Sequence, residues 1–140
     1  MPSVTPADVL ARGRRLILSG DADGYAGLFA PGGVIESPFA PPGMPARLAG
    51  RAAIREYARQ VAASPVRLDE LEEVELHQTR DPEVVITEVR ATATLTTTGR
   101  SFRTTSIQVY RIRDGQIVLF RDFADPRVFE ELTRDPHPAR

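Results

Sequence analysis

Asp122 is the side chain whose type and setting most clearly suggest chemistry. Alternation along the last predicted strand puts Asp122 on the face opposite Arg121. That face otherwise carries apolar side chains, namely Val118, Phe120 and Ala124. A carboxylate in such surroundings loses water, which raises its proton affinity and suits it to general acid–base catalysis. The alternative is a structural role, in which Asp122 pairs with an arginine or a backbone amide.

Gln108 and Ser37 are the other polar side chains that could contact a ligand. Gln108 alternates with Ser106 and Tyr110 on a predicted strand, so it is a candidate polar anchor. It can equally satisfy a neighbouring backbone group. Ser37 follows a short predicted strand, where its hydroxyl can bind a ligand or cap the strand end.

Hydrophobic side chains are predicted to form the wall of a small-molecule site. Phe39 and Met44 lie in a proline-rich loop, and a stiff loop with hydrophobic side chains is expected to cover a pocket as its rim. The other candidates lie in predicted helices and strands, where ordinary core packing is the alternative. The full predicted set is Tyr25, Phe29, Phe39, Met44, Tyr57, Val61 and Phe120.

No residue pattern predicts a metal or a cofactor. The chain has no cysteine, and its two histidines, His77 and His137, have no third ligand at metal-site spacing. All 18 basic residues are arginine, which excludes Schiff-base chemistry on a lysine. No glycine-rich phosphate loop precedes a predicted helix. We therefore expect a site that uses carboxylate, amide and hydroxyl groups.

Composition predicts one globular domain over residues 1–140. Hydrophobic residues make up 41% of the chain and charged residues 26%, which are ordinary proportions. The net charge of −1 and the lack of a basic cluster argue against a nucleic-acid partner. No apolar run approaches the ~20 residues that span a bilayer, and the N-terminus lacks a signal-peptide pattern. We expect a cytoplasmic protein with no membrane partner that binds a small hydrophobic ligand.

The order of predicted elements favours an α+β fold. Hydrophobic periodicity changes from helical to alternating near Val66. The predicted helices cover 6–20, 21–29, 51–63 and a short stretch after Pro126. The predicted strands cover 34–37, 66–79, 83–97, 101–113 and 116–124, with a two-residue hairpin turn at Asp114-Gly115. Helices on one face of a twisted sheet would enclose a cavity.

Three segments in this order resemble the nuclear transport factor 2-like superfamily over essentially the whole chain: SGDADGYAGLFAPGGVIESP, GRAAIREYA and YRIRDGQIVLFRDFADP. Within it, the chain is most similar to the SnoaL-like group, which includes polyketide cyclases. The resemblance implies a cone-shaped, curved antiparallel sheet with three helices on its concave face. It also implies that Asp122 is the acid–base residue of a cofactor-independent cyclase or isomerase. The substrate would be a hydrophobic, oxygenated small molecule of polyketide type.

The catalytic residues of ketosteroid isomerases, which share this scaffold, are not matched. Their base falls at Ser37, and their two oxyanion donors fall near Gly13 and at Gln108 or Ile107. Serine cannot shuttle the proton, and glycine offers no side-chain donor. We therefore expect no steroid isomerisation by the usual mechanism.

The residues of limonene-type epoxide hydrolases are matched only in part. Their paired arginine and aspartate fall at Val89 and Ala91, and Arg90 is predicted to face the other side of the sheet. Epoxide hydrolysis is therefore a third hypothesis. The second is a non-catalytic module that binds a small molecule or a partner, since this scaffold also serves binders.

The outer face of the sheet is predicted to form a homodimer. Ile107 and Val109 should point away from the helices, and a strand that is apolar on both faces implies a second covering layer. The resemblance implies the same contact, because relatives usually dimerise through this face.

Overall fold

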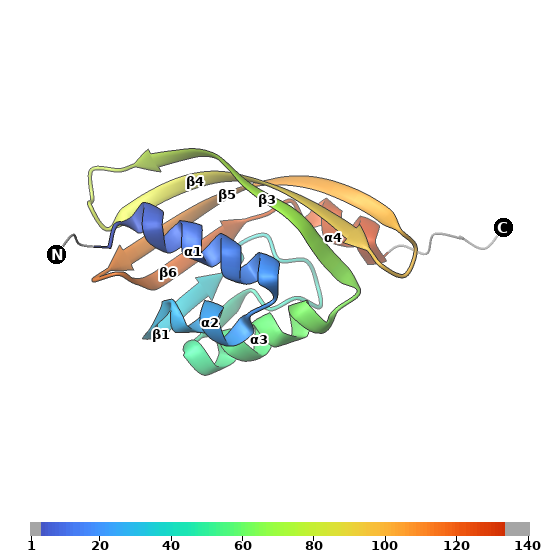
Figure 1. The fold of residues 1–140 in the computed structure, drawn as a ribbon, viewed down its shortest axis with the longest axis horizontal. Helices are drawn as coiled ribbons and strands as arrows, with labels where there is room; N and C mark the ends of the chain where they lie inside the picture. The colour runs from blue at the N-terminus through green and yellow to red at the C-terminus, as the bar shows by residue number, and fades with distance from the viewer. Residues whose placement is uncertain (1–3, 134–140) are drawn as a thin grey trace.

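The computed structural model describes residues 4–133 as a sheet with three of its four helices on one face (Figure 1). The elements along the chain are α1 (Pro6–Ser19), α2 (Ala22–Gly27), β1 (Phe29–Glu36), β2 (Arg47–Ala49), α3 (Arg51–Ala63), β3 (Val66–Gln78), β4 (Val84–Leu95), β5 (Arg100–Arg113), β6 (Gln116–Phe123) and α4 (Pro126–Thr133). This order confirms the predicted α+β class.

Local signals fix the boundaries of α1 and of the last hairpin where they were predicted. The Thr5 hydroxyl accepts a hydrogen bond from the backbone N–H of Asp8, and the Asp8 carboxylate accepts one from the backbone N–H of Thr5. Gly20, at φ 74°, ends the helix in the left-handed conformation. Asp114 and Gly115 both have positive φ, as a two-residue hairpin turn requires.

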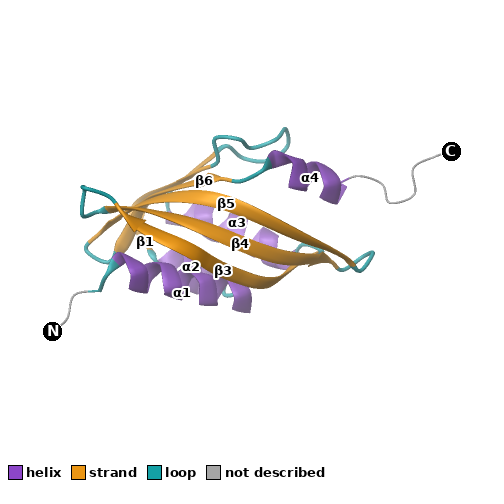
Figure 2. Ribbon diagram, turned by 90° about the horizontal axis from the view of Figure 1, so that it is seen from above, coloured by secondary structure: helices purple, strands orange, loops and turns teal. Residues whose placement is uncertain are grey.

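The six strands form one curved sheet in the order β2-β1-β6-β5-β4-β3 (Figures 1 and 2). The neighbouring pairs are antiparallel except for β1 and β6, which run parallel. The sheet is therefore mixed, whereas the sequence predicted an antiparallel one. The difference arises because α3 and four strands separate β1 from β6 along the chain, so no hairpin sets their relative direction.

Strand β1 begins earlier than predicted, and α2 ends correspondingly sooner. Pro31-Gly32-Gly33 was expected to precede the strand, but it lies within it, where the pairing with β6 shifts between Phe29 and Val34. A bulge tolerates proline and glycine because its residues do not all join the ladder of hydrogen bonds. Phe29 is therefore a strand residue and not part of the helix.

Strand β2 was not predicted at all. It lies at the end of the proline-rich loop and pairs with β1, with Leu48 opposite Ile35. Three residues are too few for an alternating pattern to be visible in the sequence. The strand ties the end of this loop to the sheet.

Helices α1, α2 and α3 pack on the concave face of the sheet, as predicted (Figures 1 and 2). The core lies between the two layers, where Ala26, Phe29 and Ile54 are completely buried. Arg51, at the start of α3, donates two hydrogen bonds to the carbonyl oxygen of Phe29 in the bulge. This contact joins the helical layer to the irregular strand.

Candidate active site

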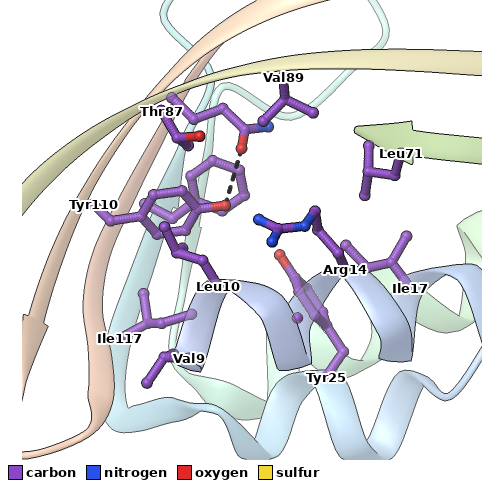
Figure 3. A pocket seen from close by; sticks show the side chains of 13 residues that line it. Val9, Leu10, Arg14, Ile17, Tyr25, Leu71, Thr87, Val89, Tyr110 and Ile117 are labelled. Atoms are coloured by element: carbon purple, nitrogen blue, oxygen red, sulfur yellow. Dashed lines mark hydrogen bonds between the residues drawn. The ribbon is translucent and has the colours of Figure 1, made fainter. Parts of the chain in front are cut away.

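A small cavity lies between α1 and the concave face of the sheet (Figure 3). Its volume is about 50 Å³, well below the ~300–1,000 Å³ typical of ligand pockets. A ligand of more than a few atoms therefore requires side chains around the cavity to move. The lining residues are Val9, Leu10, Gly13, Arg14, Ile17, Tyr25, Leu71, Thr87, Val89, Gln108, Tyr110, Ile117 and Phe120.

Three polar residues on neighbouring strands form one row across the concave face. Thr87 on β4 is the cross-strand partner of Gln108 on β5, and Gln108 is the partner of Asp122 on β6. The Tyr110 hydroxyl donates a hydrogen bond to Gln108 Oε1, at 3.1 Å. Because that phenol occupies the amide oxygen, the amide nitrogen of Gln108 is the group available to Asp122.

Asp122 lies beside the lining residues Gln108 and Phe120, although it does not line the cavity itself. Burial raises the pKa of its carboxyl group to about 6, and a hydrogen bond from Gln108 opposes only part of this effect. Its Oδ1 atom is buried and accepts no hydrogen bond from the residues described. Such a carboxyl group can exchange a proton near neutral pH.

Two arginines of the sheet, Arg121 and Arg90, face away from Asp122. Arg121 points to the other side of β6, where it pairs with Glu36 at 3.4 Å and lies over the ring of Phe123. Arg90 pairs with Glu72 at 3.6 Å. Among the ion pairs of residues 4–133, none involves Asp122. Strand parity thus correctly predicted that burial, and not charge pairing, would dominate its surroundings.

Three tyrosines lie within electrostatic reach of Asp122. Burial, and secondarily the charge of Asp122, raises the pKa of the phenols of Tyr25 and Tyr57. The pKa of Tyr110 is also raised, mainly by burial, and its ring stacks on Phe120 with centroids 4.3 Å apart. All three phenols therefore remain protonated at neutral pH and can donate hydrogen bonds.

Arg14, which the sequence interpretation missed, also lines the cavity. Its Nη1 atom pairs with Glu73 Oε2 at 2.9 Å, and the same oxygen accepts a hydrogen bond from the Thr87 hydroxyl at 3.4 Å. The available signal was helical spacing, because Arg14 lies four residues after Leu10 and three before Ile17. A charged residue on the apolar face of a helix is unusual enough to mark a site.

The structure brings together only some of the predicted ligand-contacting residues. Tyr25, Gln108 and Phe120 line the cavity. Phe29 is completely buried behind Tyr25, and their rings meet edge to face at 5.4 Å. These positions fit both ligand binding and core packing.

The other predicted residues do not line this cavity: Ser37, Phe39, Met44, Tyr57 and Val61. Phe39 was predicted at the pocket rim, but it is 58% exposed and packs edge to face on Phe123. Val61 is 46% exposed on α3. The proline-rich loop and α3 place these side chains outside the cavity lining. Their contact with a ligand therefore stays a prediction.

No group of three His, Cys, Asp or Glu side chains in the described part of the chain could hold a metal ion. His77 is half-exposed and approaches Glu75 at 3.7 Å, and His137 lies outside the described residues. Of the helices in residues 4–133, none is long and apolar enough to cross a membrane.

Comparison with known proteins gives a consistent family pattern. The family model of the SnoaL-like domain matches residues 10–120. The uncharacterized PhzA/B-like protein PA3332 of Pseudomonas aeruginosa is 38% identical over 120 residues, covering 85% of this chain and 83% of that protein. The uncharacterized protein YesE of Bacillus subtilis is 31% identical over 115 residues, covering 82% and 78% respectively.

Solved structures share the fold. A candidate isomerase from Bacillus subtilis superposes with a TM-score of 0.84 at 29% identity, covering 90% of each chain. A candidate polyketide cyclase from Pseudomonas putida has a TM-score of 0.76 at 13% identity, covering 93% of this chain and 98% of its own. At 13% identity, the similarity to the Pseudomonas putida structure concerns the fold alone.

Proposed function

The chain belongs to the SnoaL-like domain family, and from that premise we propose that it is a cofactor-independent acid–base enzyme, an isomerase or cyclase. Its substrate would be a hydrophobic small molecule with an enolisable carbonyl group. Asp122 would remove a proton from the carbon next to the carbonyl and return it to another position. In a cyclase, the same enolate would instead attack a second carbonyl carbon.

The observation that carries this proposal is the burial of the Asp122 carboxyl group without a charged partner. Its Oδ1 atom is buried without a hydrogen bond from the described residues, and burial raises its pKa to about 6. A buried polar atom without a partner is unfavourable, so a structural role alone does not explain its presence. Proton transfer near neutral pH does explain it.

Gln108 supports this role as a positioning residue. Its amide oxygen is held by Tyr110, which orients the amide nitrogen toward Asp122. The hydrogen bond from Gln108 stabilises the ionised Asp122 carboxylate, but it offsets the cost of burying that charge less than an arginine would. The carboxylate therefore retains an affinity for protons that suits an acid–base residue.

Proton exchange tests the proposal without knowledge of the natural substrate. Purified protein is incubated in D₂O with small ketones such as 2-butanone and cyclopentanone, and loss of the α-proton signals is followed by NMR. We expect exchange above the buffer rate, increasing as the pH rises through about 6, because the base must be ionised.

The matched variants are Asp122→Asn and Asp125→Asn, which remove the same charge three residues apart. Asp125 pairs with Arg127 at 2.7 Å, away from the cavity lining. Exchange should disappear in the first variant and persist in the second. Equal exchange in Asp122→Asn and the unsubstituted protein would contradict the proposal. Ketone binding without exchange would favour the non-catalytic binding module.

We also propose that the protein is a homodimer through the outer sheet face. Ile107 on β5 is 41% exposed there, and Val74 on β3 is 39% exposed. Hydrophobic side chains of this size on the uncovered face of a sheet support a contact with a second copy.

A further inference from the structure

The Arg14 guanidinium has hydrogen-bonding capacity that the protein does not use. Of its donors, Nη1 binds Glu73, and within the described residues neither Nε nor Nη2 makes a hydrogen bond. The side chain is 24% exposed, and its guanidinium group extends into the cavity (Figure 3). A guanidinium group presents its donors as a planar fork that matches a carboxylate.

Tyr25 adds a second unused donor at the same place. The residue is 8% exposed, and its hydroxyl makes no hydrogen bond within residues 4–133. It points toward the guanidinium group of Arg14, and both side chains line the cavity (Figure 3). This hydroxyl faces the cavity, so it can donate a hydrogen bond to a group that is supplied from outside the chain.

We propose that the ligand of this cavity carries a carboxylate, which is held by Arg14 and the hydroxyl of Tyr25. This inference rests on the proposed function for the site and narrows its substrate class to small carbonyl compounds with an acid group. Arg14 then binds the carboxylate on the α1 side of the cavity, while Asp122 lies on the β6 side.

The charges around Arg14 explain why an acid is preferred over a neutral compound. Hydrogen bonds between two ionised groups are about twice as strong as neutral ones, and the partly buried setting weakens their screening by water. Glu73 already neutralises part of the Arg14 charge at 2.9 Å. An incoming carboxylate therefore shares or replaces Glu73, which makes Glu73 a competitor for the ligand.

Two probes of nearly equal size measure the preference: isobutyrate and isobutyramide. They are titrated into the protein at pH 7.5, and the side-chain amide signals of Gln108 and the ring signals of Tyr25 are followed by NMR. We expect isobutyrate to bind at least tenfold more tightly than isobutyramide. Equal binding of the two probes would overturn the proposal.

Variants on α1 identify the responsible charge. Arg14→Met should abolish the preference for isobutyrate, and Arg14→Lys should retain part of it. Arg15→Met is the matched control, because Arg15 is exposed on the same helix and does not line the cavity. It should leave the preference unchanged. A preference that survives in Arg14→Met would overturn the role of Arg14.

Glu73→Gln provides a test that does not require the loss of Arg14. Removing the competing carboxylate should tighten isobutyrate binding and leave isobutyramide binding unchanged, whereas a purely structural ion pair would predict no ligand effect. Asp122→Asn should still bind isobutyrate. Failure of the carboxylate preference, with ketone exchange still dependent on Asp122, would therefore refute this inference alone.

Discussion

Asp122 and Asp125 are three residues apart, yet their surroundings have opposite effects on their carboxyl groups. Arg127 lowers the pKa of Asp125 through hydrogen bonds to its side chain, whereas burial raises the pKa of Asp122 to about 6. The first carboxylate is partly exposed and forms an ion pair, and the second is mostly buried and forms none. Residue type alone therefore does not decide which aspartate can exchange protons.

We predict that Asp122→Asn leaves the protein at least as stable at pH 8. The carboxyl pKa is about 6 in the folded protein against a reference value of 3.8, so ionised Asp122 destabilises the fold above pH 6. That difference in pKa corresponds to a destabilisation of about 3 kcal/mol by the ionised carboxylate. The variant would recover only part of this free energy, because burying the asparagine amide is also unfavourable. Urea unfolding of both proteins measures the change.

The pH dependence has a defined sign. The unsubstituted protein should gain stability relative to Asp122→Asn as the pH falls from about 6 toward 4, because the folded state binds the proton more tightly. A variant that is less stable at pH 8 would instead make Asp122 a structural residue.

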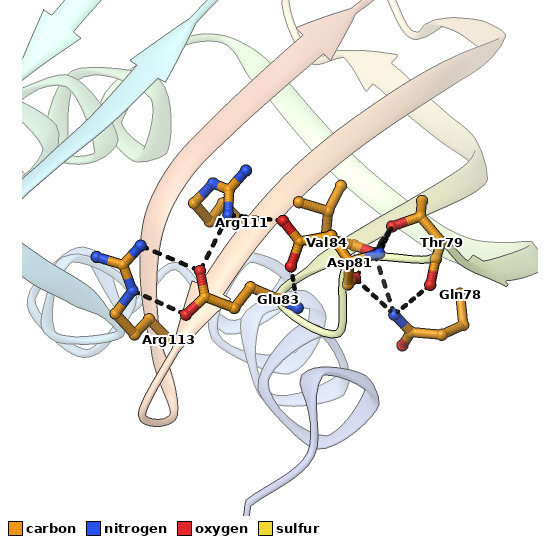
Figure 4. A network of polar contacts seen from close by, with 7 residues as sticks. All are labelled: Gln78, Thr79, Asp81, Glu83, Val84, Arg111 and Arg113. Carbon is orange, nitrogen blue, oxygen red and sulfur yellow. Dashed lines mark hydrogen bonds and ion pairs between the residues drawn. The ribbon is translucent and has the colours of Figure 1, made fainter.

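At the scale of elements, the turn between β3 and β4 is joined to β5 by a network of charges (Figure 4). Glu83 accepts hydrogen bonds from Arg111 and Arg113, and Arg111 also pairs with Asp81 at 3.1 Å. These bonds lower the pKa of Glu83 to about 2. The network joins the ends of these strands to one another at this end of the sheet.

Glu83→Gln should therefore reduce stability at neutral pH and have less effect in acid. The contribution of ionised Glu83 to the free energy of unfolding is complete above its reference pKa of 4.5. This contribution is lost as the pH falls through about 2. Urea unfolding between pH 2 and pH 7 measures this. Glu70→Gln is the control, since Glu70 is exposed on β3 and has no ion pair in the described residues. Parallel pH profiles for the two variants would contradict the prediction.

The bulge of β1 depends on one of two adjacent glycines. A Cβ atom at Gly33 would lie 2.8 Å from the carbonyl oxygen of Ile117 and 3.0 Å from that of Ala30, whereas one at Gly32 would meet nothing within 4 Å. Gly33→Ala should lower the free energy of unfolding by about 1–3 kcal/mol because backbone atoms must move. Gly32→Ala should change it by less than about 0.5 kcal/mol. Equal free energies of unfolding for the two variants, measured in urea, would refute the predicted difference between Gly33 and Gly32.

At the scale of the whole molecule, the two faces of the sheet have different surroundings. The concave face is covered by α1, α2 and α3 (Figure 2), and the outer face exposes Ile107. We predict that Ile107→Glu converts a homodimer to a monomer, because a buried charge without a partner opposes association. Light scattering at about 50 µM, where an interface with a Kd near 1 µM is occupied, measures the change.

Leu18→Glu is the control for the dimer prediction. Leu18 is 41% exposed, as Ile107 is, but lies on α1. Its substitution should leave the dimer intact. A monomeric unsubstituted protein would contradict the predicted assembly, and dissociation by Leu18→Glu alone would place the contact on the helical side.

The sequence by itself determined the features that depend on neighbouring residues. The start of α1 at Pro6, the turn at Asp114-Gly115 and the bounds of α3 follow from local hydrogen bonding and periodicity, and the structure confirms all three. Parity along one strand likewise placed Asp122 opposite Arg121. These signals are short-range, so they survive without knowledge of the fold.

Only the tertiary structure decided which side chains meet. The parallel pairing of β1 with β6, and the approach of Arg14 to Glu73 across 59 residues, depend on how distant elements pack. The unpaired donors of Arg14 and Tyr25 become visible only once the possible partners have been placed. Hydrogen bonding and burial are properties of the assembled core, and a single strand or helix pattern does not contain them.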